Sequence, residues 1–471
     1  MRVVLVVPNF RWVDSDKNAL WHYLPYNLCL LAACIRDIAD VSIVDAYKEN
    51  LSTATLKDKL DTLKPDLVGI TCLMDKYGPS LHKVAAIAKT TGAVVVAGGV
   101  YATINAEQVA QDENIDYVVK GEGEHVIREL VTNGPARRII QADRIYDLDK
   151  IPLPAYDLLD MSKYMNSAER NSVDRPSLLP YGHVMTSRGC PFGCCFCQVE
   201  QISGKEFRPR SPKSVLDEIQ WLRDTYGIKS LIFDDDNLLT DKDRAWAIFE
   251  GMIERGLTMP WKMIATAVFK LDDQLIWLMK LSGCEYVNIA IESGCERVLH
   301  KIINKPINLQ YAKDMVYWLK RENIYVAANF IVGFPTETWD EIRESLAFAD
   351  RLNADYTKIF AAMPLRNTRL WKMCEEHGAF KRDFNGVVQW GSGQIETSEF
   401  SADDLTILRA YEWDRINFTE VEKRRRTCQM MGITEEELLQ IRRETLLSSR
   451  RNITISGYSL PLHANLSVGT A

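Results

Sequence analysis

Three cysteines near the middle of the chain have the types and spacing of a metal-cluster site. Cys190, Cys194 and Cys197 form a C-x3-C-x2-C pattern on a glycine- and proline-rich loop that follows an apolar segment. Three thiolates so close in sequence can converge on one iron–sulfur cluster. No fourth cysteine follows at regular spacing, so one iron would be open to a substrate or cofactor. Cys195 lies in the same run and allows other ligand triplets.

Composition argues against nucleic-acid binding and against a secreted or membrane protein. The chain has 471 residues, of which 46% are hydrophobic and 26% are charged, and its formal net charge is -7. This charge gives no reason to expect a nucleic-acid partner. The N-terminal apolar run is too short for a signal peptide, and no apolar stretch is long enough for a membrane span. We therefore expect a cytoplasmic protein with reduced thiols, which disfavours cysteines that are merely buried or disulfide-bonded.

Apolar strand-like runs alternate with amphipathic helical segments over residues 1–135. This alternation predicts an α/β domain with a doubly wound, Rossmann-like parallel sheet. Ligands of such sheets bind at the carboxyl ends of the strands. The expected strands are residues 3–7, 41–44, 67–71, 94–97 and 115–119.

A second strand–helix series is expected over residues 181–390, after a proline-containing linker over residues 136–180. Six βα units indicate a partial (β/α)6 barrel, with its chemistry at the carboxyl ends of the strands. The cysteine loop follows the first of these strands. Residues 391–471 are more polar, and we expect a helical C-terminal region there. The expected barrel strands are residues 183–186, 230–234, 263–267, 286–291, 327–332 and 356–361.

The cysteine motif, with an aromatic residue before its last cysteine, resembles the cluster motif of the radical S-adenosylmethionine (SAM) superfamily. Three later segments, residues 233–237, 290–294 and 329–338, look like the SAM-contacting strand ends of that superfamily. The resemblance implies that Cys190, Cys194 and Cys197 hold a 4Fe-4S cluster, with Cys195 in a packing role. The SAM contacts that it implies are Phe196, Asp234, Asp235, Glu292, Ser293, Gly333, Phe334 and Pro335.

Two sets of charged residues near these motifs have alternative interpretations. Asp236 belongs to the same acidic run as Asp234 and Asp235, and we expect one or two of the three to contact SAM. Such a run after a strand often caps the next helix instead. Arg208 and Arg210 follow the cysteine loop and can pair with a carboxylate or phosphate. Ordinary solvated charges are the alternative for both arginines.

The N-terminal half is similar to a cobalamin-binding domain, through its Gly98-Gly99 turn, a Gly-Glu-Gly-Glu run over residues 121–124 and a Leu-Asp-x-Ile-Pro-x-Pro connector. Many such domains carry Asp-x-His-x-x-Gly, whose histidine ligates cobalt. This chain lacks that motif, and His22 is the nearest candidate. Cobalamin bound without a histidine ligand and an empty, vestigial domain therefore both stay open. The predicted cobalamin contacts are Pro8, Asn9, Thr71, Cys72, Gly98, Gly99, Gly121 and Glu122.

Together these motifs are typical of the cobalamin-dependent radical SAM enzymes, and of the class B methyltransferases among them. The resemblance implies an enzyme that uses a 5′-deoxyadenosyl radical and methylcobalamin to methylate an unactivated carbon of a small-molecule biosynthetic intermediate. It also implies an external electron donor of the flavodoxin or ferredoxin type. The alternatives are an oxidative cyclase or rearrangement enzyme with the same cofactors, a methylthiotransferase, and a non-catalytic corrinoid or iron–sulfur carrier.

Overall fold

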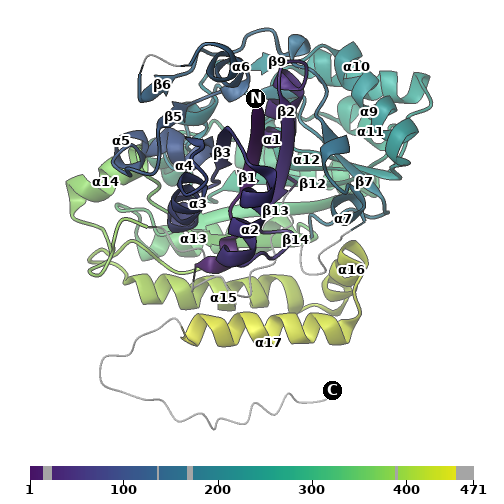
Figure 1. The fold of residues 1–471 in the computed structure, drawn as a ribbon. Coiled ribbons are helices and arrows are strands. Elements are labelled where there is room, and N and C mark those ends of the chain that lie inside the picture. Colours follow the sequence, from purple (N-terminus) through teal and green to yellow (C-terminus); the bar gives the residue numbers. More distant parts are fainter. Residues whose placement is uncertain (14–23, 135–136, 167–172, 388–390, 452–471) are drawn as a thin grey trace.

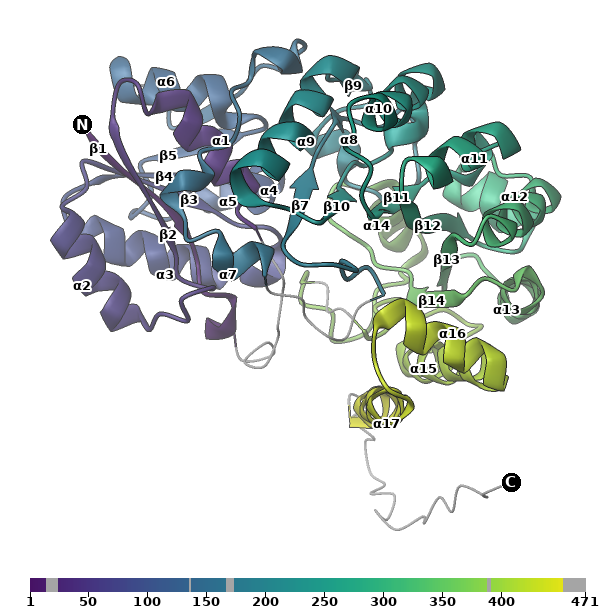
Figure 2. The same cartoon turned by 90° about the vertical axis from the view of Figure 1, so that its right-hand side faces the viewer.

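The computed structural model describes residues 1–13, 24–134, 137–166, 173–387 and 391–451. Two α/β domains lie side by side, and the C-terminal helices pack beneath the second domain (Figures 1 and 2). None of the helices in these segments is long and apolar enough to cross a membrane. His22, the nearest candidate for a cobalt ligand, falls outside the described residues.

The N-terminal domain is a six-stranded parallel sheet with the order β2-β1-β3-β4-β5-β6. Its strands are apolar runs buried on both faces; every residue of β3, for example, is buried, as expected for a parallel sheet covered by helices. This confirms the predicted doubly wound fold. The strands are β1 (Arg2–Val7), β2 (Asp40–Asp45), β3 (Leu67–Thr71), β4 (Val94–Gly98), β5 (Tyr117–Lys120) and β6 (Ile139–Gln141). The helices are α1 (Tyr26–Ile35), α2 (Thr53–Leu63), α3 (Gly78–Lys89), α4 (Gly99–Ile104), α5 (Ala106–Val109) and α6 (Gly123–Thr132).

The segment expected as a linker has regular structure at both ends. β6 extends the first sheet by pairing with β5, although its three residues are too few to give a strand signal. A short helix, α7 (Ser162–Met165), follows, and its Tyr164 hydroxyl donates a hydrogen bond to Asp45 Oδ2 at 2.8 Å. The connector is therefore packed against the N-terminal domain.

The second domain is a six-stranded parallel sheet with the order β14-β13-β12-β11-β10-β7. This sheet is the predicted partial barrel. Its strands are β7 (Tyr181–Val184), β10 (Ser230–Phe233), β11 (Trp261–Thr266), β12 (Cys284–Glu292), β13 (Tyr325–Val332) and β14 (Tyr356–Ala361). The helices are α8 (Val199–Ile202), α9 (Pro212–Tyr226), α10 (Lys242–Glu254), α11 (Asp273–Leu281), a π-helix (Val298–Ile303), α12 (Leu309–Arg321), α13 (Trp339–Leu352) and α14 (Arg369–His377).

Two short antiparallel strands close the loop that carries the cysteines. β8 (Ser187–Arg188) pairs with β9 (Arg208–Pro209), so that Arg188 lies opposite Arg208. The cysteine loop, residues 189–207, therefore begins and ends at one narrow neck.

The C-terminal region consists of α15 (Ala402–Phe418), α16 (Val421–Met431) and α17 (Glu435–Arg451), which confirms the predicted helical character. α15 packs on β14, the edge strand of the barrel sheet (Figure 2). On β14, the Thr357 N–H donates to Asn417 Oδ1 at 2.7 Å, and the Asn417 side-chain amide donates to the Thr357 carbonyl at 2.8 Å.

Candidate functional site

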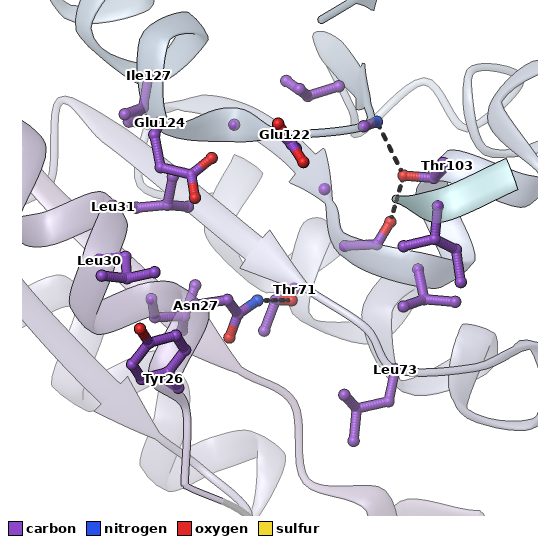
Figure 3. Close-up of a pocket in the computed structure, with 18 of the residues that line it drawn as sticks. Tyr26, Asn27, Leu30, Leu31, Thr71, Leu73, Thr103, Glu122, Glu124 and Ile127 are labelled. Atoms are coloured by element: carbon purple, nitrogen blue, oxygen red, sulfur yellow. Dashed lines mark hydrogen bonds between the residues drawn. The ribbon is translucent and has the colours of Figure 1, made fainter. Parts of the chain in front are cut away.

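A cavity of about 450 Å³ lies between the two domains (Figure 3). The N-terminal domain lines it with α1 and with the segments that follow β3, β4 and β5. The barrel lines it with β7 and with the segments that follow β7 and β10. These are the carboxyl ends of parallel strands, where both folds bind their ligands.

The neck of the cysteine loop is closed by its own backbone. The Cys190 N–H donates to the Gly204 carbonyl at 3.2 Å. Gly189 has φ +83°, and a Cβ there would lie 2.1 Å from the Glu206 carbonyl oxygen. Only glycine fits this close approach, so the residue before Cys190 is part of the turn that presents the thiols.

Cys195 differs from its neighbours in its surroundings. Cys190, Cys194 and Cys197 are partly exposed, whereas Cys195 is 1% exposed and packs in the core. The backbone of Cys195 is also fixed, because its N–H donates to the Ile303 carbonyl at 2.9 Å. Burial raises the pKa of all four thiols, and that of Cys197 reaches about 12. The structure gives Cys195 the packing role that we expected.

The three remaining thiols suit a cluster better than a single ion. Within the described residues, no three His, Cys, Asp or Glu side chains converge to hold one metal ion. In an iron–sulfur cluster each thiolate binds a different iron, so the sulfur atoms need not meet at one point. Three partly exposed cysteines on one loop, with Phe196 half-buried beside them, fit this requirement.

The acidic run after β10 separates into two cavity residues and one residue that fixes the backbone. Asp234 and Asp236 line the cavity. Asp235 does not; it is 3% exposed, and its Oδ1 accepts hydrogen bonds from Thr186 N at 3.0 Å and Ser187 Oγ at 2.5 Å. Asp235 therefore holds the strand that leads into the cysteine loop, so its position does not favour the predicted SAM contact.

His183 of β7 joins the two acidic residues at the cavity wall. Its Nδ1 lies 3.2 Å from Asp234 Oδ2, and its side chain is 20% exposed. Burial, and then the neighbouring Asp235, raise the pKa of Asp236 to about 6, while a hydrogen bond from the Gly189 backbone opposes this shift. The barrel side of the cavity therefore presents three groups that can exchange hydrogen bonds or protons with a ligand.

Glu292 and Ser293, both predicted SAM contacts, lie in different environments. Glu292 has φ +74° at a bulge in β12, and its Oε1 accepts a hydrogen bond from Lys305 Nζ at 2.8 Å. Lys305 also opposes the burial-driven rise in the pKa of Cys194, so this ammonium lies near the thiols. Ser293 is fully buried, and its Oγ is hydrogen-bonded to Ser345 Oγ at 2.7 Å. The ion pair, unlike the serine, lies beside the cysteines, and it is buried.

The Gly-Phe-Pro turn after β13 is packed against protein. A Cβ on Gly333 would lie 2.3 Å from Leu405 Cδ1, so the missing side chain admits α15 rather than a cofactor. Phe334 and Pro335 are buried, and the Gly333 and Phe334 N–H groups donate to Glu337 Oε2 at 2.6 and 3.0 Å. Close approach of adenine to Gly333 from the Cβ side, as the glycine suggested, is therefore blocked by Leu405.

Glycines shape the N-terminal wall of the cavity. A Cβ on Gly99, which has φ +84°, would lie 2.6 Å from Thr71 Oγ1 and 3.0 Å from the Cys72 backbone nitrogen. A Cβ on Gly98 would meet no atom within 4 Å. Thr71 is fixed because its Oγ1 accepts a hydrogen bond from Asn27 Nδ2 at 2.8 Å (Figure 3). The predicted contacts at the ends of β3 and β4 therefore come together at one open face.

The other predicted cobalamin contacts are divided. Gly121 and Glu122 line the cavity, but both carboxylate oxygens of Glu122 are bound by Arg208. Pro8 and Asn9 do not line it. The Asn9 amide donates to the Leu51 carbonyl at 3.0 Å, and its Oδ1 accepts from the Arg11 N–H at 3.0 Å, so this side chain caps a turn.

The N-terminal wall fits a large planar group with little need for polar contacts. Leu30, Leu31 and Ile127 add apolar surface beside the glycines (Figure 3). Among the described residues that line the cavity, His183 of the barrel is the sole histidine. A corrin ring fits the open glycine face, and the described part of the N-terminal wall offers no imidazole to its metal.

Sequence reasoning did not single out His183, Arg188 or Lys305, and it did not separate Asp236 from Asp235. The parity of the acidic run could have separated Asp235 from its neighbours, because alternate residues at a strand end point to opposite faces. Lys305 gave no signal, since it reaches Glu292 across the π-helix.

Family profiles agree with this division of the chain. The Radical SAM superfamily profile matches residues 184–349, and the B12 binding domain profile matches residues 20–131. An uncharacterized methyltransferase of Pyrococcus horikoshii is 34% identical over 79% of this chain and 83% of its own length. The anaerobic magnesium-protoporphyrin IX monomethyl ester cyclase of Rubrivivax gelatinosus is 29% identical over 75% of this chain and 66% of its own length.

The fold is shared with a solved structure, the cobalamin-dependent SAM radical enzyme OxsB with aqua-cobalamin bound. The TM-score is 0.70 at 16% identity, covering 95% of this chain and 72% of that one. The chain is thus a radical SAM enzyme with a B12-binding domain. It belongs to the cobalamin-dependent radical SAM methyltransferase family, whose cofactors are a 4Fe-4S cluster, SAM and cobalamin.

Proposed function

We propose that this enzyme methylates an unactivated carbon of a small-molecule biosynthetic intermediate. The observation that carries the proposal is that both domains line the same cavity. The glycine face of the B12-binding domain forms one wall, and the carboxyl ends of the barrel strands form the other. A substrate in this cavity would lie between the two cofactors. When bound, the cluster with SAM supplies a carbon-centred radical, and methylcobalamin supplies the methyl group.

The residues that we assign to the cluster and to SAM surround the cysteine loop. Cys190, Cys194 and Cys197 hold the cluster. Lys305, kept in place by Glu292, suits the carboxylate of SAM, because its ammonium lies beside the thiols. Asp236, which adjoins the Gly189 turn, suits the SAM ammonium. Phe196 would pack beside the cluster. The domain limits that we propose are those predicted from the sequence, except that β6 extends the N-terminal domain to residue 141.

The His183–Asp234 pair is our candidate for orienting the substrate. Both side chains line the cavity on the barrel side, opposite the glycine face. Asp234 Oδ2 lies 3.2 Å from the Nδ1 atom of the ring, so the two side chains form one polar group at the cavity wall. A substrate with a hydroxyl, amine or carboxylate near the reacting carbon would find a partner there. We place the reaction in a reducing cytoplasm, with a flavodoxin- or ferredoxin-like protein as the electron donor.

Oxidative cyclisation with the same cofactors is the second candidate. The similarity to the Rubrivivax cyclase favours it, because that relative shares most of the present chain. The two reactions differ in their use of SAM, since only a methyltransferase needs to pass the SAM methyl group to cobalamin.

The fate of a labelled methyl group tests the proposal without knowledge of the substrate. The anaerobically reconstituted enzyme is incubated with hydroxocobalamin, a low-potential reductant and SAM that carries a trideuterated methyl group. We expect trideuteromethyl-cobalamin by mass spectrometry. Cobalamin that binds but stays unmethylated, while 5′-deoxyadenosine forms, would favour the cyclase. Failure to bind cobalamin at all would remove both candidates.

A further inference from the structure

Four buried charges join the two domains beside the cavity. Glu122 lies between β5 and α6, Glu124 lies in the first turn of α6, and Arg188 and Arg208 come from β8 and β9. Arg208 Nη1 donates to Glu122 Oε2 at 2.8 Å, and its Nη2 donates to Glu122 Oε1. Arg188 donates to Glu124 Oε1 and lies 3.6 Å from Glu122 Oε1. The four side chains are between 3% and 14% exposed.

The arginines stand at the neck of the cysteine loop. Arg188 and Arg208 are directly opposite each other in the β8–β9 pair, and all three predicted cluster ligands lie in the loop between them. Arg208 also donates to the Ser203 carbonyl at 2.9 Å, inside the loop. The two carboxylates of the B12-binding domain therefore pair with the arginines at which the cysteine loop begins and ends.

The glutamates are linked in turn to the glycine face of the cavity. Gly121 N–H donates to Thr103 Oγ1 at 3.0 Å, and that hydroxyl donates to the Gly99 carbonyl at 2.8 Å (Figure 3). A ligand that rests on Gly99 therefore contacts a backbone that is hydrogen-bonded, through Thr103, to Gly121, the residue before Glu122. Hydrogen bonds and ion pairs therefore connect Gly99, at the cavity, to the neck of the cysteine loop.

Stability alone is a weak explanation for such a network. Burying charged pairs costs desolvation energy, and apolar side chains in their place are often as stable. What a two-pronged arginine–carboxylate pair adds is a fixed geometry. We propose that Glu122, Glu124, Arg188 and Arg208 are positioning residues that transmit occupancy of the cavity to the cysteine loop. The identity of the occupant, cobalamin, rests on the proposed function.

Hydrogen–deuterium exchange of the intact protein, with and without hydroxocobalamin, measures this transmission. In the wild-type protein we expect the ligand to slow exchange of the amides in residues 190–204 by about tenfold, as well as those around Gly99. In a Glu122→Gln, Glu124→Gln variant we expect protection around Gly99 to persist while protection of the loop is lost. Glu129→Gln is the matched control, because Glu129 lies on α6 and is exposed. It should behave as the wild type.

Loop protection that persists in the double variant would overturn the proposal, as would a wild-type loop that does not respond to bound hydroxocobalamin. If the double variant does not fold, Glu122→Gln with Arg208→Gln removes one charge of each sign and leaves no unpaired charge. We expect this pair to restore folding without restoring loop protection, and full recovery of both would show a merely structural role.

The proposed function and this inference fail differently. A wild-type protein that binds no hydroxocobalamin contradicts the proposed function. The exchange rate of the loop without ligand then decides the inference. It should be about tenfold faster in the Glu122→Gln, Glu124→Gln variant than in the wild type, since the neck has lost its charged hydrogen bonds. Equal exchange rates of the loop in the variant and the wild type would refute the proposed positioning role of the four residues.

Discussion

The two walls of the cavity are built on different physical principles. The N-terminal wall is mainly glycines, two threonines and aliphatic side chains, and the carboxylates of its Glu122 and Glu124 are already bound by arginines, so it can recognise a ligand mainly by shape. The barrel wall carries His183, Asp234 and Asp236, and burial raises the pKa of Asp236 to about 6. Added side-chain atoms on the glycine wall should displace the ligand, whereas binding at the charged wall should be more sensitive to a change of charge than to a change of size. The difference indicates which substitutions will affect each cofactor separately.

The largest effect should come from the cluster ligands. Replacing Cys190, Cys194 and Cys197 by alanine should remove the iron and lower 5′-deoxyadenosine formation by at least about 100-fold, because the radical chemistry belongs to the cofactor. Iron analysis and chromatography of the nucleoside measure this. The variant should still bind hydroxocobalamin, since the glycine wall is unchanged. Cys195→Ala, the control, should keep its iron, and iron retained by the triple variant would contradict the ligand assignment.

Gly98→Ser tests the shape-selective wall. The new Cβ would meet no protein atom within 4 Å, and serine is a good residue at a helix N-cap, so the melting temperature without cofactor should not fall. A ligand packed against Gly98 would be displaced. We expect the Kd for hydroxocobalamin, measured by its visible spectrum, to rise about tenfold. Unchanged affinity with unchanged stability would move the corrin away from this glycine.

The Lys305–Glu292 ion pair, which lies beside the cysteines and not in the cavity lining, tests the cofactor site of the barrel. Lys305→Met combined with Glu292→Gln avoids a buried unpaired charge and removes the ammonium proposed for the SAM carboxylate. We expect KM for SAM in the cleavage reaction to rise about fivefold, while hydroxocobalamin affinity stays the same. Lys301→Met is the control, because Lys301 is exposed on the same segment. An equal loss of affinity for SAM and for hydroxocobalamin would mean that the two cofactor sites are not independent.

The last prediction concerns stability and not cofactor binding: Glu337 holds the turn after β13. Burial raises its pKa from 4.5 to about 7. A raised pKa stabilises the fold fully below pH 4.5, and this contribution is lost as pH rises through 7. Glu337→Gln keeps an acceptor for the two N–H groups and avoids that loss. Its free energy of unfolding should exceed that of the wild type by on the order of 2 kcal/mol at pH 8 and by little at pH 5.

Thermal or urea unfolding between pH 5 and 8, without cofactors, checks this difference. Glu376→Gln, on an exposed face, should shift nothing. A difference between Glu337→Gln and the wild type that does not change with pH would mean that the carboxylate is ionised throughout.

The longer strands were predictable because each is a continuous apolar run between amphipathic helical segments, and such a run indicates a strand buried on both faces. β6 and the β8–β9 pair were not, since strands of two or three residues are defined by their partners rather than by their own sequence. The same limit applies to the site. The cysteine spacing and Gly98-Gly99 are local signals; the glycines line the cavity, and the cysteine loop reaches it through Ile202 and Ser203. Lys305 reaches Glu292, and Glu122 binds Arg208, only through tertiary contacts that no local pattern records.

Asn417 has a consequence for how the molecule behaves in a crowded solution. Its side-chain amide hydrogen-bonds both backbone groups of Thr357 on β14. An exposed edge strand is a template for pairing with another chain. Here one side chain of α15 satisfies the backbone groups of Thr357, so β14 is protected at this position from pairing with a strand of a second molecule.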